Sequence, residues 1–346
     1  MRYIFIFCLS FFVQPAWAEN LTPLYSSPLA NMTYPSVAGE YLVYTQRVNQ
    51  EHQIMRLHRT DLYGTAKDIS TRFTNEVVRN GVALSNGDIA YVSNRLGHVA
   101  PWLSHEHQET TLATGAFQAL LVPNHLDVSA QTWVFDSTLE TTRTPRIINQ
   151  FTDQRLHHEL LGQAWRMYHS KLWTFKSSYP QTQQGLSNRF QQAYLFSFQR
   201  GENEVSMLSD GFDASLSQDG KRMVFVRETN GNFDLWLQNS DGSGLKQLTT
   251  NTYADVEPSL SPDGKRVVFV SNRNSRGDVL QTFIHTLDIA SGKVTTITSG
   301  LGVIDGGPAW LDDNTIIFHS NRDPKAPNTD TVDNWRLWTV PLPKSL

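Results

Sequence analysis

Two segments of the chain read almost alike: DASLSQDGKRMVFV at 213–226 and EPSLSPDGKRVVFV at 257–270. Each has a short run of small residues, an Asp-Gly pair, two basic residues and then an apolar run. The Asp-Gly pairs at 219–220 and 263–264 suit a tight hairpin turn, because glycine adopts a positive φ without steric cost. Both segments are therefore predicted to form a short strand, a turn and a second, buried strand.

The same order of features recurs along the whole chain. Weaker copies lie at 34–47, 81–95 and 307–322, and two more degraded copies lie at 126–136 and 162–175. A repeat with a fixed order of parts indicates one structural unit that is copied and stacks against its neighbours.

Each copy continues with two further strands. A polar loop leads to a third strand of alternating pattern, as at 233–238 and 335–340, and a turn leads to a fourth, as at 245–250 and 293–298. Four antiparallel strands in roughly 40–50 residues are typical of a β-propeller blade. The sequence therefore predicts an all-β fold, a single β-propeller domain of four-stranded antiparallel blades over residues 19–346.

The number of blades follows from the number of copies. Seven copies account for the domain, so seven blades are predicted, and six blades with an elaborated insert are the alternative because residues 116–205 follow the pattern poorly. The last copy supplies only three strands. The segment LTPLYSS at 21–27 resembles a fourth strand. We expect it to pair into the last blade and close the ring, which leaves no long edge exposed.

The segment PSLSPDGKRVVFVSNRNSRGD at 258–278 resembles the WD40-like repeat of TolB-type β-propellers, which also forms the propeller domains of prolyl-oligopeptidase-like enzymes. The resemblance is strong over 207–322 and recognisable over 34–112. It implies the fold and says almost nothing about function. The chain is expected to depart from TolB in having no separate N-terminal α/β domain and in having seven blades, where TolB has six, so the partners of TolB are not carried over residue by residue.

Residues 1–18 have the features of a cleavable secretory signal peptide. Arg2 gives a positive start, residues 3–13 are almost wholly apolar, and Ala-Trp-Ala at 16–18 is a cleavage site of the A-x-A type. The one cysteine, Cys8, lies inside this segment, so the exported chain is expected to contain no disulfide. The sequence predicts a periplasmic protein.

Composition and hydropathy argue against a nucleic-acid partner and against a membrane-spanning segment. The formal net charge of −4 gives no polybasic signature, so nucleic acid is not expected to bind. After residue 18 no apolar run is long enough to cross a bilayer. No transmembrane segment is therefore expected in the mature chain.

The tripeptide Ser-Asn-Arg occurs four times. Three copies, at 93–95, 271–273 and 320–322, lie just after a predicted second strand, and the fourth is at 187–189. In a four-stranded blade, the loops after second strands share one face with the loops before first strands, where acidic residues recur. The candidate binding rim on this face comprises Arg95, Arg273, Arg322, Asp255, Glu257 and Asp305.

Two interpretations of this rim are open. In the favoured one, each arginine pairs with an acidic residue or a loop carbonyl nearby and holds a hairpin in place, a role that suits its planar fork of donors. In the other, the arginines and acids line a polar binding pocket at the mouth of the channel. Two long loops, at 176–190 and 321–335, are expected on the same face and make it the predicted binding face.

Motifs of enzyme chemistry are scarce in the sequence. It contains no G-x-S-x-G, and no cysteine is left after cleavage to act as a nucleophile or a thiolate ligand. Most of the histidines fall between residues 52 and 169. Among these, His157 and His158 are better candidate metal ligands than His105 and His107, because they lie in a predicted loop between blades.

The sequence therefore predicts an exported, non-catalytic binding protein without a cofactor, which presents its loop-rich rim to another envelope protein or to a cell-envelope glycan. The alternative comes from resemblance. Oligogalacturonate lyase has a propeller of related repeats with a metal held by histidines, which implies a metal-dependent carbohydrate-active enzyme with a divalent ion at His157 and His158.

Overall fold

A computed structural model describes residues 20–24, 31–48, 51–69, 78–83, 89–93, 100–105, 108–111, 126–127, 134–135, 146–153, 194–199, 205–217, 219, 221–229, 232–239, 241–278, 281–330 and 335–342. Their regular structure is β-strand, with a short 3-10 helix at Arg273–Ser275, which confirms the all-β prediction. No helix among these residues has the length and the hydropathy needed to cross a membrane.

Four of the described sheets have four antiparallel strands in chain order, as a propeller blade requires. Their strands are β2 Asn31–Ala38, β3 Tyr41–Val48, β4 Glu51–His58 and β5 Lys67–Asp68; β6 Val78–Ala83, β7 Ile89–Ser93, β8 Ala100–His105 and β9 Gln108–Thr111; β15 Phe212–Leu216, β16 Arg222–Thr229, β17 Asn232–Asn239 and β18 Lys246–Gln247; and β19 Asp255–Leu260, β20 Arg266–Ser271, β21 Phe283–Asp288 and β22 Val294–Thr296. The repeat copies at 34–47, 81–95, 213–226 and 257–270 supply the first two strands of these sheets, as predicted.

Another sheet joins strands from the divergent part of the chain. Its strands are β10 Leu126–Asp127, β11 Val134–Phe135, β12 Arg146–Asp153, β13 Tyr194–Gln199 and β14 Val205–Asp210. β10 and β11 both pair with β12, which pairs with β13 across the intervening segment. The copy at 162–175 lies outside the described residues, so the seven-bladed and six-bladed arrangements both remain predictions.

The last sheet takes in the start of the chain. β23 Asp305–Asp312, β24 Thr315–Ser320 and β27 Arg336–Pro341 are antiparallel neighbours, and β1 Thr22–Pro23 lies on the other side of β27. Thr22 pairs with Thr339, and the Leu24 N–H donates to the Leu337 carbonyl at 2.8 Å. The N-terminal segment is thus the fourth strand of this sheet, and the closing of the whole ring remains a prediction.

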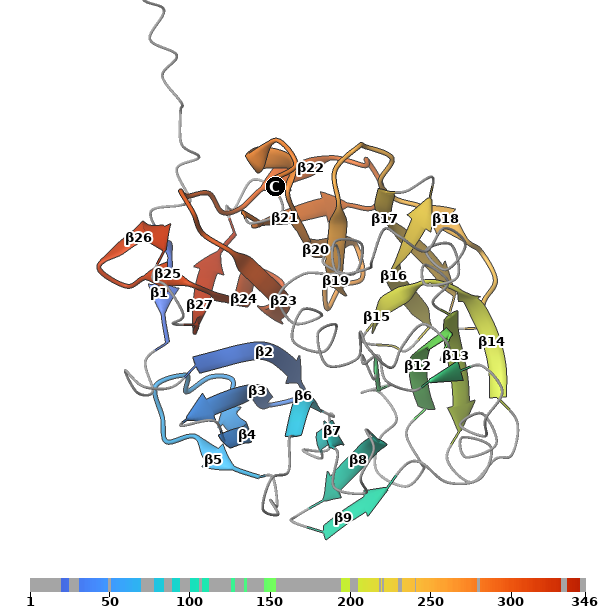
Figure 1. Ribbon diagram of the computed structural model, residues 1–346, viewed down its shortest axis with the longest axis horizontal. Coiled ribbons are helices and arrows are strands. Elements are labelled where there is room, and N and C mark those ends of the chain that lie inside the picture. The colour runs from blue at the N-terminus through green and yellow to red at the C-terminus, as the bar shows by residue number, and fades with distance from the viewer. Residues whose placement is uncertain are drawn as a thin grey trace, which may run out of the picture.

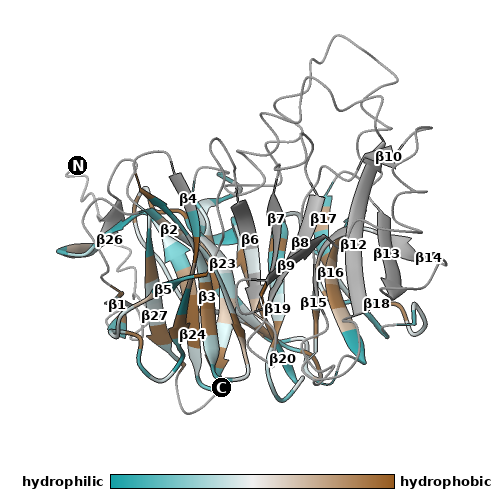
Figure 2. Cartoon of the chain, turned by 90° about the horizontal axis from the view of Figure 1, so that it is seen from below, coloured by the Kyte–Doolittle hydropathy of each residue, from teal (hydrophilic) through white to brown (hydrophobic). Residues whose placement is uncertain are grey.

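The sheets are arranged around a common centre, with their first strands innermost (Figure 1). The β6–β9 sheet contacts the β2–β5 sheet, which contacts the last sheet; the order then runs through β19–β22 and β15–β18 to the sheet of β12. The second strands lie between neighbouring sheets and are buried on both faces, from Met223 to Val226, Val267 to Val270 and Ile316 to Phe318. Figure 2 shows hydrophobic residues along the middle of β3, β16 and β24.

Candidate functional site

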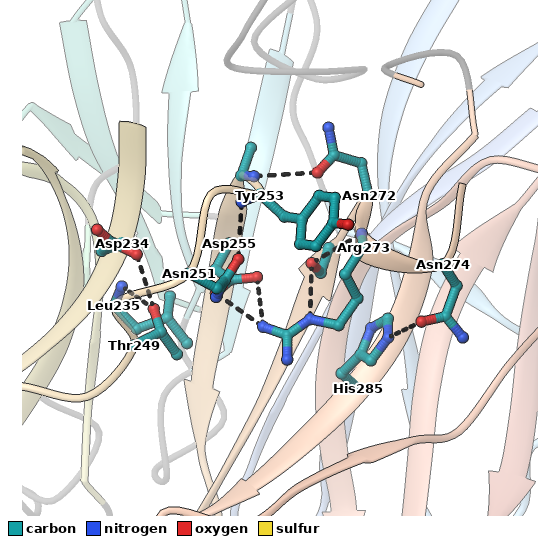
Figure 3. Close-up of polar contacts among 12 residues, drawn as sticks. Asp234, Leu235, Thr249, Asn251, Tyr253, Asp255, Asn272, Arg273, Asn274 and His285 are labelled. Carbon is teal, nitrogen blue, oxygen red and sulfur yellow. Dashed lines mark hydrogen bonds and ion pairs between the residues drawn. The ribbon is translucent and has the colours of Figure 1, made fainter. Parts of the chain in front are cut away.

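The Ser-Asn-Arg motif that follows β20 fastens the end of this second strand to the start of the first strand, β19. The Ser271 hydroxyl accepts hydrogen bonds from the Arg273 main-chain N–H at 3.2 Å and from Arg273 Nε at 3.1 Å. The Asn272 side-chain oxygen accepts the Ala254 N–H at 3.0 Å. Arg273 Nη2 donates to both carboxylate oxygens of Asp255 at 2.8 Å (Figure 3). Every side chain of the motif therefore has a structural contact.

The motif that follows β24 repeats this arrangement. The Ser320 hydroxyl accepts the Arg322 N–H at 3.3 Å, and the Asn321 side-chain oxygen accepts the Ile304 N–H at 2.7 Å. Arg322 Nε and Nη2 donate to the two oxygens of Asp305 at 2.9 and 2.6 Å. In both described copies the arginine is paired with an acid, as the favoured interpretation predicts.

The two ion pairs differ in their exposure to solvent. Both side chains of the Arg322–Asp305 pair are 0% exposed. In the other pair Asp255 is 0% exposed, whereas 18% of the Arg273 side chain is exposed. Three of the predicted rim residues are thus enclosed by the fold, and Arg273 reaches the surface.

The described part of the long loop at 321–335 contains a small hairpin. β25 Arg322–Asp323 pairs with β26 Ala326–Asp330, and the hairpin projects from the outer part of the last sheet (Figure 1). It lies at the end of the sheets where second strands end and first strands begin. We call this end, with the segments 248–254, 272–278, 281–282, 297–304 and 322–330, the Arg face.

A β-bulge interrupts the first strand of each of five sheets. The register shifts between residues 33 and 36, 79 and 82, 212 and 215, 256 and 259, and 306 and 309. Within the bulges Tyr34, Glu257 and Gly307 have positive φ, at 54°, 51° and 53°. This conformation is rare for residues other than glycine, and such strain concentrates at functional positions. The bulges make the innermost strands a second candidate region beside the rim.

The sequence contains a signal for these bulges, the position of proline residues. A proline follows each of the three residues with positive φ, at 35, 258 and 308. Proline cannot donate to a strand ladder and is confined to edges, strand starts and bulges. Its recurrence at equivalent positions of three copies therefore indicates a bulge rather than a regular strand.

Glu257 joins two neighbouring first strands near the centre. Its Oε2 accepts the Gly307 N–H at 2.6 Å, and its side chain is half-buried. A Cβ atom on Gly306 would lie 2.6 Å from His319 Nε2 and 3.2 Å from Glu257 Oε2. Glycine at 306 therefore leaves the space that the His319 ring occupies.

His319 is buried against two aromatic rings, those of Tyr34 and Trp335, and holds a bulge in place. Its Nδ1 accepts the Tyr34 N–H at 3.3 Å, and its ring lies 4.6 Å from the Tyr34 ring and 5.3 Å from that of Trp335. Burial lowers the pKa of His319 to about 3, so the ring is neutral at pH 7. Because Nδ1 accepts, the hydrogen is on Nε2. His319 positions the strained Tyr34 backbone.

A buried carboxylate lies close to the Arg273–Asp255 pair. Asp234, on β17, is 4% exposed and accepts hydrogen bonds of 3.3 Å from Asn232, Gln247 and Thr249. Burial and the Asp255 carboxylate raise the pKa of Asp234 to about 6. The surroundings of Asp255 are therefore already rich in negative charge.

Several predicted site residues cannot be placed. Arg95, His157, His158 and the loop at 176–190 lie outside the described residues. Within the part of the chain that the structure describes, no group of three or more His, Cys, Asp or Glu side chains is arranged to hold a metal ion. The predicted metal ligands are therefore neither supported nor opposed by the geometry.

Comparisons with known proteins bear on the fold. No family model and no curated protein sequence matches the chain. Among solved structures, an oligogalacturonate lyase in complex with manganese is 16% identical with a TM-score of 0.54, covering 96% of both chains. A putative TolB from Agrobacterium tumefaciens is 16% identical with a TM-score of 0.54, covering 94% of this chain and 97% of that one. The chain has a β-propeller fold like that of TolB.

A third match belongs to the same group of folds. Oligogalacturonate lyase from Vibrio parahaemolyticus is 14% identical with a TM-score of 0.55, covering 94% of both chains. At these identities the matches show the fold alone. The matched proteins carry different names, so the fold does not indicate one function. The function of this propeller has to be argued from its own residues.

Proposed function

We propose that this TolB-like propeller is an exported, non-catalytic binding protein that uses its Arg face to bind another protein or a glycan of the cell envelope. The leader-like segment at 1–18 supports export to the periplasm. No cofactor and no nucleic-acid partner is part of the proposal, in keeping with the net charge of −4.

The strained bulges of the first strands carry the proposal. A non-glycine residue in this conformation costs about 1–3 kcal/mol, and Gly307 shows that glycine fits the same position of the repeat. Tyr34 contacts His319 and Glu257 accepts the Gly307 N–H, but glycine would adopt this conformation without the steric cost. Both lie near the Arg-face end of their strands, so a ligand at the centre of this face accounts for them.

The predicted rim residues have different roles in this proposal. Glu257 and Arg273 contact the ligand, because both reach the surface. Asp255, Asp305 and Arg322 hold the loops in place from buried positions. Arg95 is expected to act like Arg273 or Arg322 in its own blade.

Two exposed leucines allow the binding face to be tested with a matched control. Leu301 is 74% exposed on the Arg face, and Leu245 is 44% exposed at the opposite end, just before β18. A photoreactive amino acid is placed at one or the other position in the exported protein, and cells are irradiated. We expect a reproducible cross-linked species from position 301 and none from position 245.

The opposite pattern, or no cross-linked species from either position, would contradict binding at the Arg face. Mass spectrometry of the product distinguishes a protein partner from a glycan. Secretion and solubility of the two variants are compared first, so that a misfolded variant is not scored.

The metal-dependent lyase is the second candidate, supported by the fold likeness to oligogalacturonate lyases, one of them in complex with manganese. Its proposed ligands are His157 and His158, with a divalent ion as cofactor. Metal analysis of the purified protein and absorbance of unsaturated products from pectic oligomers test it. Activity that is lost in His157→Ala and His158→Ala, together with the metal, would replace the binding proposal.

A further inference from the structure

Arg322 and Arg273 occupy equivalent positions of the repeat, and every side-chain nitrogen of Arg322 donates a hydrogen bond inside the chain. Besides its two bonds to Asp305, through Nε and Nη2, Arg322 donates through Nη1 to the Ser299 carbonyl at 2.8 Å and to the Pro327 carbonyl at 2.6 Å. Pro327 lies on β26, the outer strand of the hairpin. A main-chain carbonyl of an extended segment is therefore the natural acceptor at this nitrogen.

Arg273 has no such segment over it. Its Nε and Nη2 are bonded to Ser271 and Asp255, and Nη1 has no hydrogen-bond partner among the described residues. Nη1 carries no dashed line in Figure 3. This nitrogen is also not among the enclosed atoms that lack a partner, so it is open to solvent. The described residues of the loop after β20 place no carbonyl in a hydrogen bond with Nη1.

The charges around Arg273 favour a neutral acceptor. Asp255 already neutralises the guanidinium, and Asp234 adds a second carboxylate close by. A bound anion would be repelled by both, whereas a carbonyl oxygen accepts a hydrogen bond without adding charge. His285, whose pKa burial and the Arg273 charge lower to about 3, adds no compensating positive charge at pH 7.

We propose that Arg273 Nη1 binds a main-chain carbonyl of an extended partner peptide, which takes the place that the Pro327 carbonyl has at Arg322. The inference rests on the proposed function, since it names the kind of partner that the Arg face receives. The Tyr253 ring, beside Arg273 in Figure 3, offers an apolar surface to the peptide next to this hydrogen bond.

The probe is a blocked peptide with the sequence of residues 325–329, KAPNT, acetylated and amidated so that it carries no carboxylate. It is added to the full exported protein with ¹⁵N-labelled arginines, and the guanidinium resonances are followed by NMR. We expect a saturable shift of the Arg273 signals. Arg273→Lys keeps the charge but loses the fork, and should weaken binding about tenfold or more.

Arg59→Lys is the control, because Arg59 is an exposed arginine in the loop after β4, outside the Arg face. It should bind the peptide as the wild type does. Thermal unfolding of all variants checks that they are folded. The shift in the wild-type protein tests the inference even if a variant does not fold.

Three results would overturn the inference. They are no saturable shift up to about 10 mM peptide, equal binding by Arg273→Lys, or an equal shift with acetate that also displaces the peptide, which would mark a carboxylate site. If position 301 still cross-links to a partner, each of these results rejects the peptide contact at Arg273 but does not contradict the proposed function. If the peptide binds but position 301 captures nothing, the proposed function fails instead.

Discussion

At the residue scale, the Ser-Asn-Arg motif shows how one tripeptide can be structural in both described copies and yet differ in exposure. The sequence predicted the Arg–Asp pairs, because a residue repeated at equivalent positions is usually part of the repeat. It could not predict that Arg322 is enclosed and Arg273 is open. That difference depends on the hairpin at 322–330, whose course over Arg322 no local pattern encodes.

The two pairs should therefore respond differently to loss of the acid. Asp305→Asn leaves a fully buried guanidinium without its counter-charge and should lower the free energy of unfolding by about 3–5 kcal/mol. Asp255→Asn should cost less, on the order of 1–3 kcal/mol, because Arg273 can be hydrated. Urea unfolding at pH 7 measures both. Equal losses of unfolding free energy in the two variants would show that the difference in exposure does not affect stability.

The buried His319 should make stability depend on pH. Its folded pKa of about 3 lies below the ordinary value of about 6.5, so the unfolded state binds the extra proton first. The stabilisation is complete above pH 6.5 and is lost as pH falls toward 3. Between pH 7 and pH 5, the free energy of unfolding should fall by about 2 kcal/mol less in His319→Gln than in the wild type. Parallel stability curves would contradict this assignment.

At the element scale, hairpins were predicted more reliably than the strands that line the centre. Asp-Gly turns and apolar second strands are local patterns, and the structure pairs the strands on either side of each predicted turn, β15 with β16 and β19 with β20. The bulges were missed because Tyr34 and Glu257 have a positive φ that residue type alone argues against. The three prolines that follow were the available signal.

The second strands should carry much of the stability. Phe269 on β20 is 0% exposed and packs in the main hydrophobic cluster. Phe269→Ala should lower the free energy of unfolding by about 3–5 kcal/mol. Tyr63→Ala, at a residue that is 68% exposed, is the control and should change it by less than about 0.5 kcal/mol. Comparable losses in urea unfolding would contradict the packing described for β20.

At the scale of the whole molecule, the repeat predicted the propeller and left the number of blades open. Regular copies flank the divergent segment, and in that segment the copies at 126–136 and 162–175 have lost the turn and the apolar run that define the unit. Local patterns therefore give the fold where they are repeated, and they cannot count blades where the pattern decays. The pairing of the N-terminal segment with β27, at Thr22–Pro23, was predictable because an unpaired edge is costly.

The most direct test of the account is a disulfide between the two ends of the chain. Thr22 and Thr339 are cross-strand partners, and Cys8, the only native cysteine, lies in the predicted signal peptide. In the exported Thr22→Cys, Thr339→Cys variant we expect one intramolecular disulfide, no free thiol, an N-terminus at Glu19 and a gain of about 2–4 kcal/mol in stability. Two free thiols in the folded protein, or a disulfide between two molecules, would contradict a propeller whose exported N-terminus completes its own last sheet.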